Sequence, residues 1–329
     1  MVGGMTAYPG AGGSDQALAE DLEQYRRELT GYCYRMLGSV FDAEDAVQET
    51  MVRAWRGIEG FEGRSAVRSW LYRIATNVCL DLLRGSQRRA RPVDLGPSGT
   101  ADSFTGATLP EATWIQPIPD ARVLPEYGDP AELAASKETV RLAFVAALQY
   151  LPARQRAVLI LREVLRWQAA EVAELLDTSV ASVNSALQRA RATMSAHDAE
   201  EPIPEVAAGD QQTLLTRYVD AFERYDITSL VSLLHEDAVM TMPPFDFWLR
   251  GPVEMGKFFL GPGGKCRGSR LVATQANGCA AFGCYHPDPG GYRPWALQVI
   301  EVSGDRITGH HNFVDPGLFA ASGLPDRLA

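Results

Sequence analysis

The stretch that decides the fold begins with FDAEDAVQETMVRAW, residues Phe41 to Trp55, and continues with SWLYRIATNVCLDLLRGSQRRAR, residues Ser69 to Arg91. In both segments apolar residues recur every three or four positions, which predicts two amphipathic helices. The first helix offers carboxylates, and the second offers arginines and aromatic rings. A small bundle that carries both is suited to docking on a basic protein surface while it binds nucleic acid. The pattern therefore favours a transcription factor over an enzyme.

Length and composition place this stretch in a larger globular chain. The chain has 329 residues, of which 46% are hydrophobic and 22% are charged, so we expect two or three domains. No apolar run approaches the roughly 20 residues that cross a bilayer, so no membrane partner is predicted. The start, MVGGMTAYPGAGGSDQ, has neither a basic beginning nor an apolar core. Residues 1–19 are therefore predicted to be a flexible tail rather than a signal peptide, and the protein to be cytoplasmic.

The cysteines give no sign of a metal or cofactor. Their spacing matches no set of metal ligands, and their odd number fits a reducing compartment. Cys279 and Cys284 could form a redox pair, but buried free thiols are the favoured interpretation. The five are Cys33, Cys79, Cys266, Cys279 and Cys284.

The net charge of −10 argues against nucleic-acid binding until it is divided along the chain. Residues 21–91 and 138–196 each carry +2, whereas residues 92–137 carry −5 and residues 197–329 carry −7. Between Arg64 and Arg91 there are seven arginines and one acidic residue. A local basic surface can bind DNA whatever the total charge of the chain.

The domain organisation follows the same divisions. Residues 20–91 and 138–196 show helical periodicity, and residues 92–137 are predicted to form an acidic, proline-rich linker. Residues 197–209 are a second, short acidic linker. From residue 210 on, helices give way to short β-rich runs bounded by Gly and Pro, such as AVMTM and WALQVIEV. The predicted fold class is multidomain: two all-α domains, then an α+β domain over residues 210–325 with a curved antiparallel sheet.

The block 138–196 contains the clearest local motif. AAEVAELLD, residues Ala169 to Asp177, and SVNSALQRARATM, residues Ser182 to Met194, predict two helices joined by a tight turn. This arrangement matches a helix-turn-helix, whose second helix enters the major groove of DNA. A plain helical hairpin with a solvated face is the alternative. The residues that could contact bases or phosphates are Ser179, Ser182, Asn184, Ser185, Gln188, Arg189 and Arg191.

Together with the preceding LPARQRAVLILREVLRW, this block resembles the promoter-recognition domain of bacterial sigma factors, which reads the −35 element. YRRELTGYCYRMLGSVFDAEDAVQETMVRAW resembles the family segment that docks on the clamp helices of the largest subunit of RNA polymerase. FEGRSAVRSWLYRIATNVCLDLLRGSQRR resembles the segment that melts and binds the −10 element. Two such domains in this order are typical of extracytoplasmic function (group IV) sigma factors. The resemblance implies sigma region 2 at residues 20–91 and sigma region 4 at residues 138–196, with core RNA polymerase and promoter DNA as partners.

The resemblance also implies roles for individual residues. Polymerase contacts are expected from one side of the first helix, through Asp42, Glu44, Asp45, Glu49, Met51 and Trp55. Contacts with the opened −10 strand and its phosphates are expected from Arg64, Arg68, Trp70, Arg73, Asn77, Arg84 and Arg88. The alternatives are structural: the acidic residues can form an ordinary solvated face, and Trp70 can lie in the core.

Two features depart from the family pattern. Many members place a Lys and an Arg where this chain has Asn184 and Ala186, and two fewer charges should lower the salt slope of DNA binding by roughly two. The linker is long and acidic. In the family it passes near the RNA path of the polymerase, so it could compete with RNA or act as a simple tether.

The C-terminal third resembles the SnoaL-like domain, a cone of helices wrapped by a curved sheet, which several actinobacterial group IV sigma factors carry. The resemblance rests on LLTRYVDAFERYDITSLVSLLHEDAVMTMPP and on HHNFVDPGLFAASGLP. Relatives include cyclases and isomerases, but no compact Asp/His constellation is evident from spacing, and GPGGKCRG lacks the spacing of a phosphate-binding loop. A regulatory domain is therefore favoured over an enzyme. Candidates for lining a small-molecule pocket are Tyr218, His235, Phe247, Trp248, Trp295 and His310.

The sequence thus predicts a cytoplasmic group IV sigma factor, without enzymatic activity, that is modulated in cis by its SnoaL-like domain. Two alternatives remain. A ligand-sensing helix-turn-helix regulator would bind duplex DNA without polymerase, and a SnoaL-type enzyme would convert a cyclic substrate.

Overall fold

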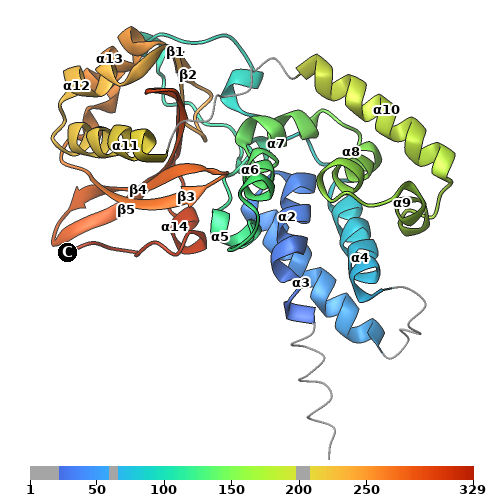
Figure 1. Ribbon diagram of the computed structural model, residues 1–329. Coiled ribbons are helices and arrows are strands. Elements are labelled where there is room, and N and C mark those ends of the chain that lie inside the picture. The colour runs from blue at the N-terminus through green and yellow to red at the C-terminus, as the bar shows by residue number, and fades with distance from the viewer. Residues whose placement is uncertain (1–21, 59–65, 198–207) are drawn as a thin grey trace, which may run out of the picture.

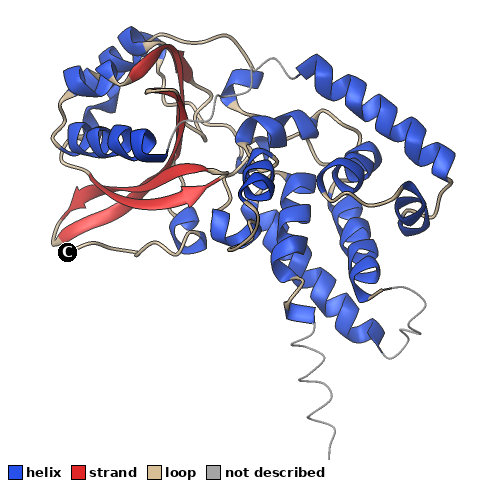
Figure 2. Cartoon of the chain, in the orientation of Figure 1, coloured by secondary structure: helices blue, strands red, loops and turns tan. Residues whose placement is uncertain are grey.

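A computed structural model describes residues 22–58, 66–197 and 208–329, and its helical part lies beside a cone built on a curved sheet (Figure 1). The strands of the described residues all lie between residues 234 and 313, and they gather on one side of the molecule (Figure 2). None of the helices in the described part combines the length and apolar character that crossing a bilayer requires. The predicted N-terminal tail, Arg64 and most of the predicted linker 197–209 lie outside the described residues.

Three helices form the first bundle, which we call the N-terminal bundle: α2 (Arg26–Leu37), α3 (Val40–Gly57) and α4 (Val67–Leu82). Gly38 ends α2 with a φ of 72°, a conformation that a residue without Cβ adopts readily. Ser39 then caps α3 by accepting a hydrogen bond from the amide of Asp42 at 3.1 Å. The break between α2 and α3 is therefore set by two adjacent residues.

The second helical unit, which we call the helix-turn-helix unit, contains α7 (Leu142–Gln149), α8 (Ala153–Leu159), α9 (Ala169–Leu175) and α10 (Val180–His197). A single π-helical turn at Ile160–Val164 extends α8. Ser179 accepts a hydrogen bond from the amide of Ser182 at 3.1 Å and so caps α10. Val183 and Leu187 are buried, so α10 packs through the face that its periodicity predicts.

The segment between these units is folded rather than extended. It forms helical turns at Pro92–Asp94, Ala101–Ser103 and Glu111–Thr113, then α5 (Asp120–Val123) and α6 (Pro130–Glu138). Ala101 lies in the core of the C-terminal domain, whereas Ile115 and Ile118 lie in the core of the helical units. These apolar residues are buried against partners far away in the sequence, which explains why periodicity does not reveal the structure of the segment.

The C-terminal domain contains one six-stranded sheet in the order β2-β1-β6-β5-β4-β3. The strands are β1 (Leu234–Thr241), β2 (Trp248–Arg250), β3 (Arg270–Ala276), β4 (Cys279–Asp288), β5 (Gly291–Ser303) and β6 (Arg306–Phe313). β1 and β6 pair in parallel and the other neighbours pair antiparallel, so the expectation of a wholly antiparallel sheet was wrong for this one pair. No hairpin turn joins β1 to β6, since the rest of the domain lies between them in sequence, and their relative direction is therefore not set by a turn.

The two faces of this sheet belong to different cores. One face is covered by α11 (Ala208–Glu223), α12 (Ile227–Ser232) and α13 (Pro252–Leu260), and α14 (Gly317–Ala321) lies on the other (Figure 1). In β4, Phe282 packs toward the helical cone, while its neighbour Ala281 joins a core that also contains residues of both helical units. Because side chains alternate across a strand, every second residue contributes to the core between domains. The C-terminal domain therefore packs directly on the helical units.

The last turn of α2, Tyr34 to Met36, is where the modules meet, and we call it the junction turn. The hydroxyl of Tyr34 donates to the carbonyl of Gln116 in the linker at 2.9 Å. Arg35 donates to the carbonyl of Thr139, just after α6, at 3.0 Å. The carbonyl of Met36 accepts a hydrogen bond from Arg156 of α8.

Asn277 completes the junction from the C-terminal domain. It is fully buried, has a φ of 55°, and forms the β3–β4 turn with Gly278. Its side-chain amide donates to the hydroxyl of Tyr34 at 2.7 Å and to the carbonyl of Val140 at 2.6 Å, and its oxygen accepts from the amide of Ile118 at 2.9 Å. One side chain thus bonds the N-terminal bundle, the linker and the segment that precedes α7.

We predict that Asn277→Ala lowers the free energy of unfolding by roughly 2–4 kcal/mol, because it leaves the buried amide of Ile118 and carbonyl of Val140 without these partners. Urea unfolding of the full chain measures the loss. Asn184→Ala, at an exposed position of α10, serves as the control and should change stability by less than about 0.5 kcal/mol. Equal midpoints for the two variants would contradict the role of Asn277.

Candidate nucleic-acid interface

The acidic side of α3 is partly occupied by arginines of the same chain. Asp42 pairs with Arg89 at 2.6 Å, and Glu44 lies 2.8 Å from Arg122 of α5, a close ion pair without hydrogen-bond geometry. Glu49 pairs along its own helix with Arg53. The other three residues expected on this side remain at least partly accessible: Asp45 is exposed, Met51 is half-buried and Trp55 is 58% exposed.

The basic helix α4 is covered by the helix-turn-helix unit. Arg68 pairs with Glu28 at 2.9 Å, and its guanidinium lies 5.4 Å from the ring centroids of both Tyr72 and Trp167. Trp167, just before α9, packs on Tyr72 with 5.0 Å between ring centroids. Arg73 donates to the carbonyl of Glu174 in α9 at 3.1 Å. The face of α4 expected to meet the opened strand therefore faces α9.

The remaining residues expected at this interface differ in exposure. Arg88 lies over the ring of Tyr150, 3.9 Å from its centroid, and so also contacts the helix-turn-helix unit. Asn77 and Arg84 are exposed, and Trp70 is half-buried against the bundle core, between the two alternatives considered for it. Arg68, Arg73 and Arg88 each contact the helix-turn-helix unit, at separate points, and Arg73 and Arg88 stay exposed. Asn77 and Arg84 are exposed as well.

The outer face of α10 is open to solvent. Arg191 pairs with Glu163 of the π turn at 2.5 Å, and Ser182 shares the capping turn with Ser179. Figure 1 places α10 at the edge of the molecule, away from the sheet. The exposed residues on this face are Ser182, Asn184, Ser185, Gln188, Arg189 and Arg191.

Inside the cone, Tyr218 and His310 belong to a closed ring of hydrogen bonds. Nε2 of His310 lies 2.8 Å from the hydroxyl of Tyr218, which donates to Gln298 at 2.7 Å. Gln298 donates to Asn312 at 3.2 Å, and the amide of Asn312 returns to Nδ1 of His310 at 2.9 Å. This order assigns the proton of His310 to Nε2. Burial, followed by the nearby His311, lowers the pKa of His310 to about 3, so the ring is neutral at physiological pH.

The other four residues considered for a pocket have different neighbours. His235 is exposed on β1, and Trp295 stacks on His286 with 4.4 Å between ring centroids. Phe247 and Trp248 face the linker, where the indole N–H donates to the carbonyl of Gly96 at 2.9 Å. Of the six predicted residues, the structure joins Tyr218 to His310 and gives the others separate surroundings.

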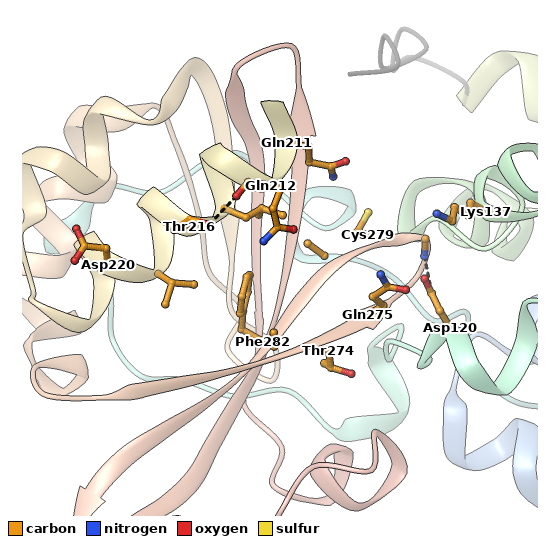
Figure 3. A pocket seen from close by; sticks show the side chains of 15 residues that line it. Asp120, Lys137, Gln211, Gln212, Thr216, Asp220, Thr274, Gln275, Cys279 and Phe282 are labelled. Atoms are coloured by element: carbon orange, nitrogen blue, oxygen red, sulfur yellow. Dashed lines mark hydrogen bonds between the residues drawn. The ribbon is translucent and has the colours of Figure 1, made fainter. Parts of the chain in front are cut away.

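A cavity of about 630 Å³ lies between the C-terminal domain and the linker (Figure 3). Its walls combine side-chain amides and hydroxyls with apolar groups. They include Gln212 and Thr216 from α11, Gln275 and Phe282 from the sheet, and Asp120 and Lys137 from the linker. Most of its lining thus belongs to the C-terminal domain, and the linker contributes Asp120 and Lys137 at one edge.

Glu301 of β5 is a half-buried carboxylate at the seam between the modules. Burial raises its pKa, but His311, 3.4 Å away, together with Arg91 and Arg141, outweighs burial and lowers the pKa to about 2. Arg91 follows the N-terminal bundle and Arg141 precedes α7. One carboxylate of the C-terminal domain thus interacts with cations from both flanks of the linker.

Because folding lowers the pKa of Glu301, its contribution to stability is present above its ordinary value of 4.5 and is lost as the pH falls toward about 2. We predict that the difference in free energy of unfolding between the full chain and Glu301→Gln is constant above pH 4.5 and shrinks as the pH falls from 4.5 toward about 2. Urea unfolding across a pH series measures it, with Glu236→Gln at an exposed position as the control. A difference that does not depend on pH would rule out this electrostatic role.

Several residues that matter for this arrangement are missed by motif reasoning. Asn277 and Gly278 form an Asn-Gly pair, which predicts a hairpin turn but not the partner that the turn contacts. Arg35 and Arg156 lie within helical patterns that give no sign of their buried hydrogen bonds. Phe104 is an isolated aromatic residue in a stretch without periodicity.

Comparison with known proteins agrees with this geometry. The family models described as Sigma-70 region 2 and Sigma-70 region 4 match residues 21–89 and 141–194. The ECF RNA polymerase sigma factor SigG of Mycobacterium tuberculosis is 43% identical over 93% of this chain and 83% of its own length. SigJ of the same organism is 28% identical over 94% of this chain and 95% of its own. A crystal structure of SigJ superposes with a TM-score of 0.57 at 25% identity, covering 93% of this chain and 99% of that one. The chain therefore belongs to the extracytoplasmic function family of RNA polymerase sigma factors and carries a SnoaL-like C-terminal domain.

Proposed function

We propose that this sigma factor binds core RNA polymerase, directs initiation at selected promoters, and is held in a closed state by its own C-terminal domain. Residues 20–91 bind polymerase and the −10 element, and residues 138–196 read the −35 element. The SnoaL-like domain, residues 210–325, sets how readily the two separate. The observation that carries the proposal is the packing of Trp167 and α9 on α4 in a chain whose C-terminal domain bonds both flanking segments through Asn277.

The spacing of promoter elements requires the closed state to open. Elements about 10 and 35 base pairs upstream of the start site are about 25 base pairs apart, which is about 85 Å along B-form DNA. In this structure Tyr72 of α4 and Trp167 touch, with 5.0 Å between ring centroids. Two units in such contact do not reach both elements together. Opening is therefore a step of promoter binding.

The polymerase-facing side is restrained in the same state. Arg122 of the linker forms an ion pair with Glu44, and Arg89 forms one with Asp42. A basic polymerase surface competes for the same carboxylates, so binding of polymerase and release of the linker favour each other. In the closed state the linker holds the helical units together. Its acidic residues can contact polymerase only after the linker has undocked.

An enzymatic role receives little support from the cone. Tyr218 and His310 are the groups that acid–base chemistry would use, but both are buried and their polar atoms are engaged in the closed ring with Gln298 and Asn312. We infer a regulatory domain that acts in the cytoplasm, where polymerase works. A small molecule that needs both walls of the 630 Å³ cavity would stabilise the closed state.

Reconstituted transcription with core polymerase tests this proposal. At limiting sigma concentration, Asn277→Ala and residues 1–204 should both give more promoter-specific transcript than the full chain. Weakening the closed state by about 1 kcal/mol raises the open population about fivefold. Glu236→Gln is the control and should match the full chain. Unchanged output from both altered forms would refute cis regulation, and no specific transcript from any form would refute the sigma function.

We also predict that Arg189→Ala weakens binding to duplex carrying the −35 element and lowers the slope of log affinity against log salt by about 1, because one phosphate contact is lost. Fluorescence anisotropy over a salt series measures both quantities in the full chain, since α10 is exposed in the closed state. Arg224→Ala, remote from α10 at the end of α11, should leave the slope unchanged. The same slope for both variants would exclude Arg189 from the interface.

A further inference from the structure

The linker has a second contact with the SnoaL-like domain, separate from the junction turn. Residues 96–109 run along the loop that precedes β2 and along α13. The amide of Gly99 donates to the carbonyl of Trp248 at 2.8 Å, and the amide of Leu109 donates to the carbonyl of Pro244 at 3.0 Å. Between these two anchors the chain turns into the domain, and Ala101 is only 2% exposed.

The centre of this contact is one aromatic ring. Phe104 packs on Phe245, Phe247 and Phe258, with ring centroids 5.3, 5.0 and 5.4 Å away. The interplanar angles of 69°, 66° and 88° are edge-to-face, the arrangement that aromatic quadrupoles favour. We call the three receiving phenylalanines the ring cleft. They are contributed by the C-terminal domain alone, so the cleft does not depend on the linker for its walls.

Beside the ring cleft, a carboxylate of the C-terminal domain binds the backbone of the linker. Oε2 of Glu254 accepts from the amide of Ala101 at 2.9 Å, and the same carboxylate pairs with Lys257 at 2.7 Å. A Cβ on Gly99 would lie 3.2 Å from the ring of Phe247, which shows how closely the linker backbone approaches the cleft. The site thus resembles a receptor with an aromatic subsite and a neighbouring acceptor.

The occupant is poised for exchange. Phe104 is half-buried rather than enclosed. Its segment, residues 96–109, is held to the domain by five hydrogen bonds of backbone groups, each worth about 1 kcal/mol net. A tethered side chain competes at an effective concentration in the millimolar range, which a free ligand of moderate affinity can match. The present occupant also defines the chemistry that the cleft accepts.

We propose that the ring cleft is a binding site for compact aromatic molecules, which exchange with Phe104 and thereby detach residues 96–109 from the SnoaL-like domain. This inference rests on the cis regulation proposed above. A ligand in the ring cleft would weaken the docking of the linker on the SnoaL-like domain, whereas a ligand that contacts both walls of the 630 Å³ cavity would strengthen it. The cleft is preferred over that cavity because the mixed walls of the cavity do not specify a ligand, whereas the cleft already holds an aromatic ring.

The first test uses 4-fluorotoluene as the probe and fluorine NMR on the full chain without polymerase. Phe104→Ala removes the competing ring, so it should bind the probe at least tenfold more tightly than the unaltered chain. Tyr127→Ala removes an aromatic ring of the same linker that is 88% exposed, and it should bind as the unaltered chain does. Equal affinity of the two variants for the probe overturns the proposal.

The second test needs no substitution and so does not depend on the folding of a variant. At saturating 4-fluorotoluene, hydrogen exchange at the amides of Gly99, Ala101 and Leu109 should accelerate at least tenfold in the unaltered chain. The amide of Gln116, bonded to the carbonyl of Gly38 at 3.0 Å, should stay protected and reports on the junction. Unchanged exchange at the first three amides overturns the proposal. Because neither test measures transcription, the ring cleft can fail while the sigma function stands.

Discussion

The closed state depends on the requirement that the buried polar groups of the junction turn be satisfied. Arg35 is buried, and burial lowers its pKa to about 10. It donates to the carbonyl of Gly31 at 2.7 Å and to the carbonyl of Thr139 at 3.0 Å. Arg156 is in the same situation, with its pKa also lowered to about 10 by burial, and it donates to Gln149 at 2.6 Å and to Met36. Separating the N-terminal bundle from the linker or from α8 would leave such a cation with fewer partners, and an unsatisfied buried charge costs several kcal/mol. The C-terminal domain joins the same junction through Asn277, which donates to the hydroxyl of Tyr34 beside Arg35. The N-terminal bundle, the linker and the helix-turn-helix unit are therefore expected to dock together rather than one at a time.

The same requirement makes the closed state reversible. When the junction opens, water replaces the protein partners of these groups, and the net loss per hydrogen bond is only about 1 kcal/mol. The contacts that cover α4 are also individually weak. They include the exposed ion pair of Arg73 with Glu174 and the packing of Trp167 on Tyr72. Exposed ion pairs contribute little. On this proposal, polymerase and promoter DNA that engages both elements bind the open form more tightly than the closed form, so they can shift the equilibrium by differential affinity.

The local elements could be predicted from sequence, and their docking could not. Periodicity predicts α3, α4 and α10 because each buries a continuous apolar stripe, and Ser179 predicts the cap of α10 because capping depends on neighbours within three residues. The contacts of Asn277 join residues more than 130 positions apart, and no local pattern encodes such a pairing. The linker was expected to be irregular for the same reason, since the partners of Phe104 lie in the C-terminal domain. Family resemblance identified the protein family correctly, but it could not indicate that the helix-turn-helix unit packs on α4 in this chain.

The central claim is that the two promoter-reading units are in contact in the free protein and separate on polymerase. The most direct test is a distance measurement between spin labels at Ser86, just after α4, and Ser195, near the end of α10, both of which are exposed. In the free chain we expect a short, narrow distance distribution. On addition of core polymerase and promoter DNA it should lengthen toward the about 85 Å that separates the two elements. A distribution that is the same in the free and bound states would contradict the claim.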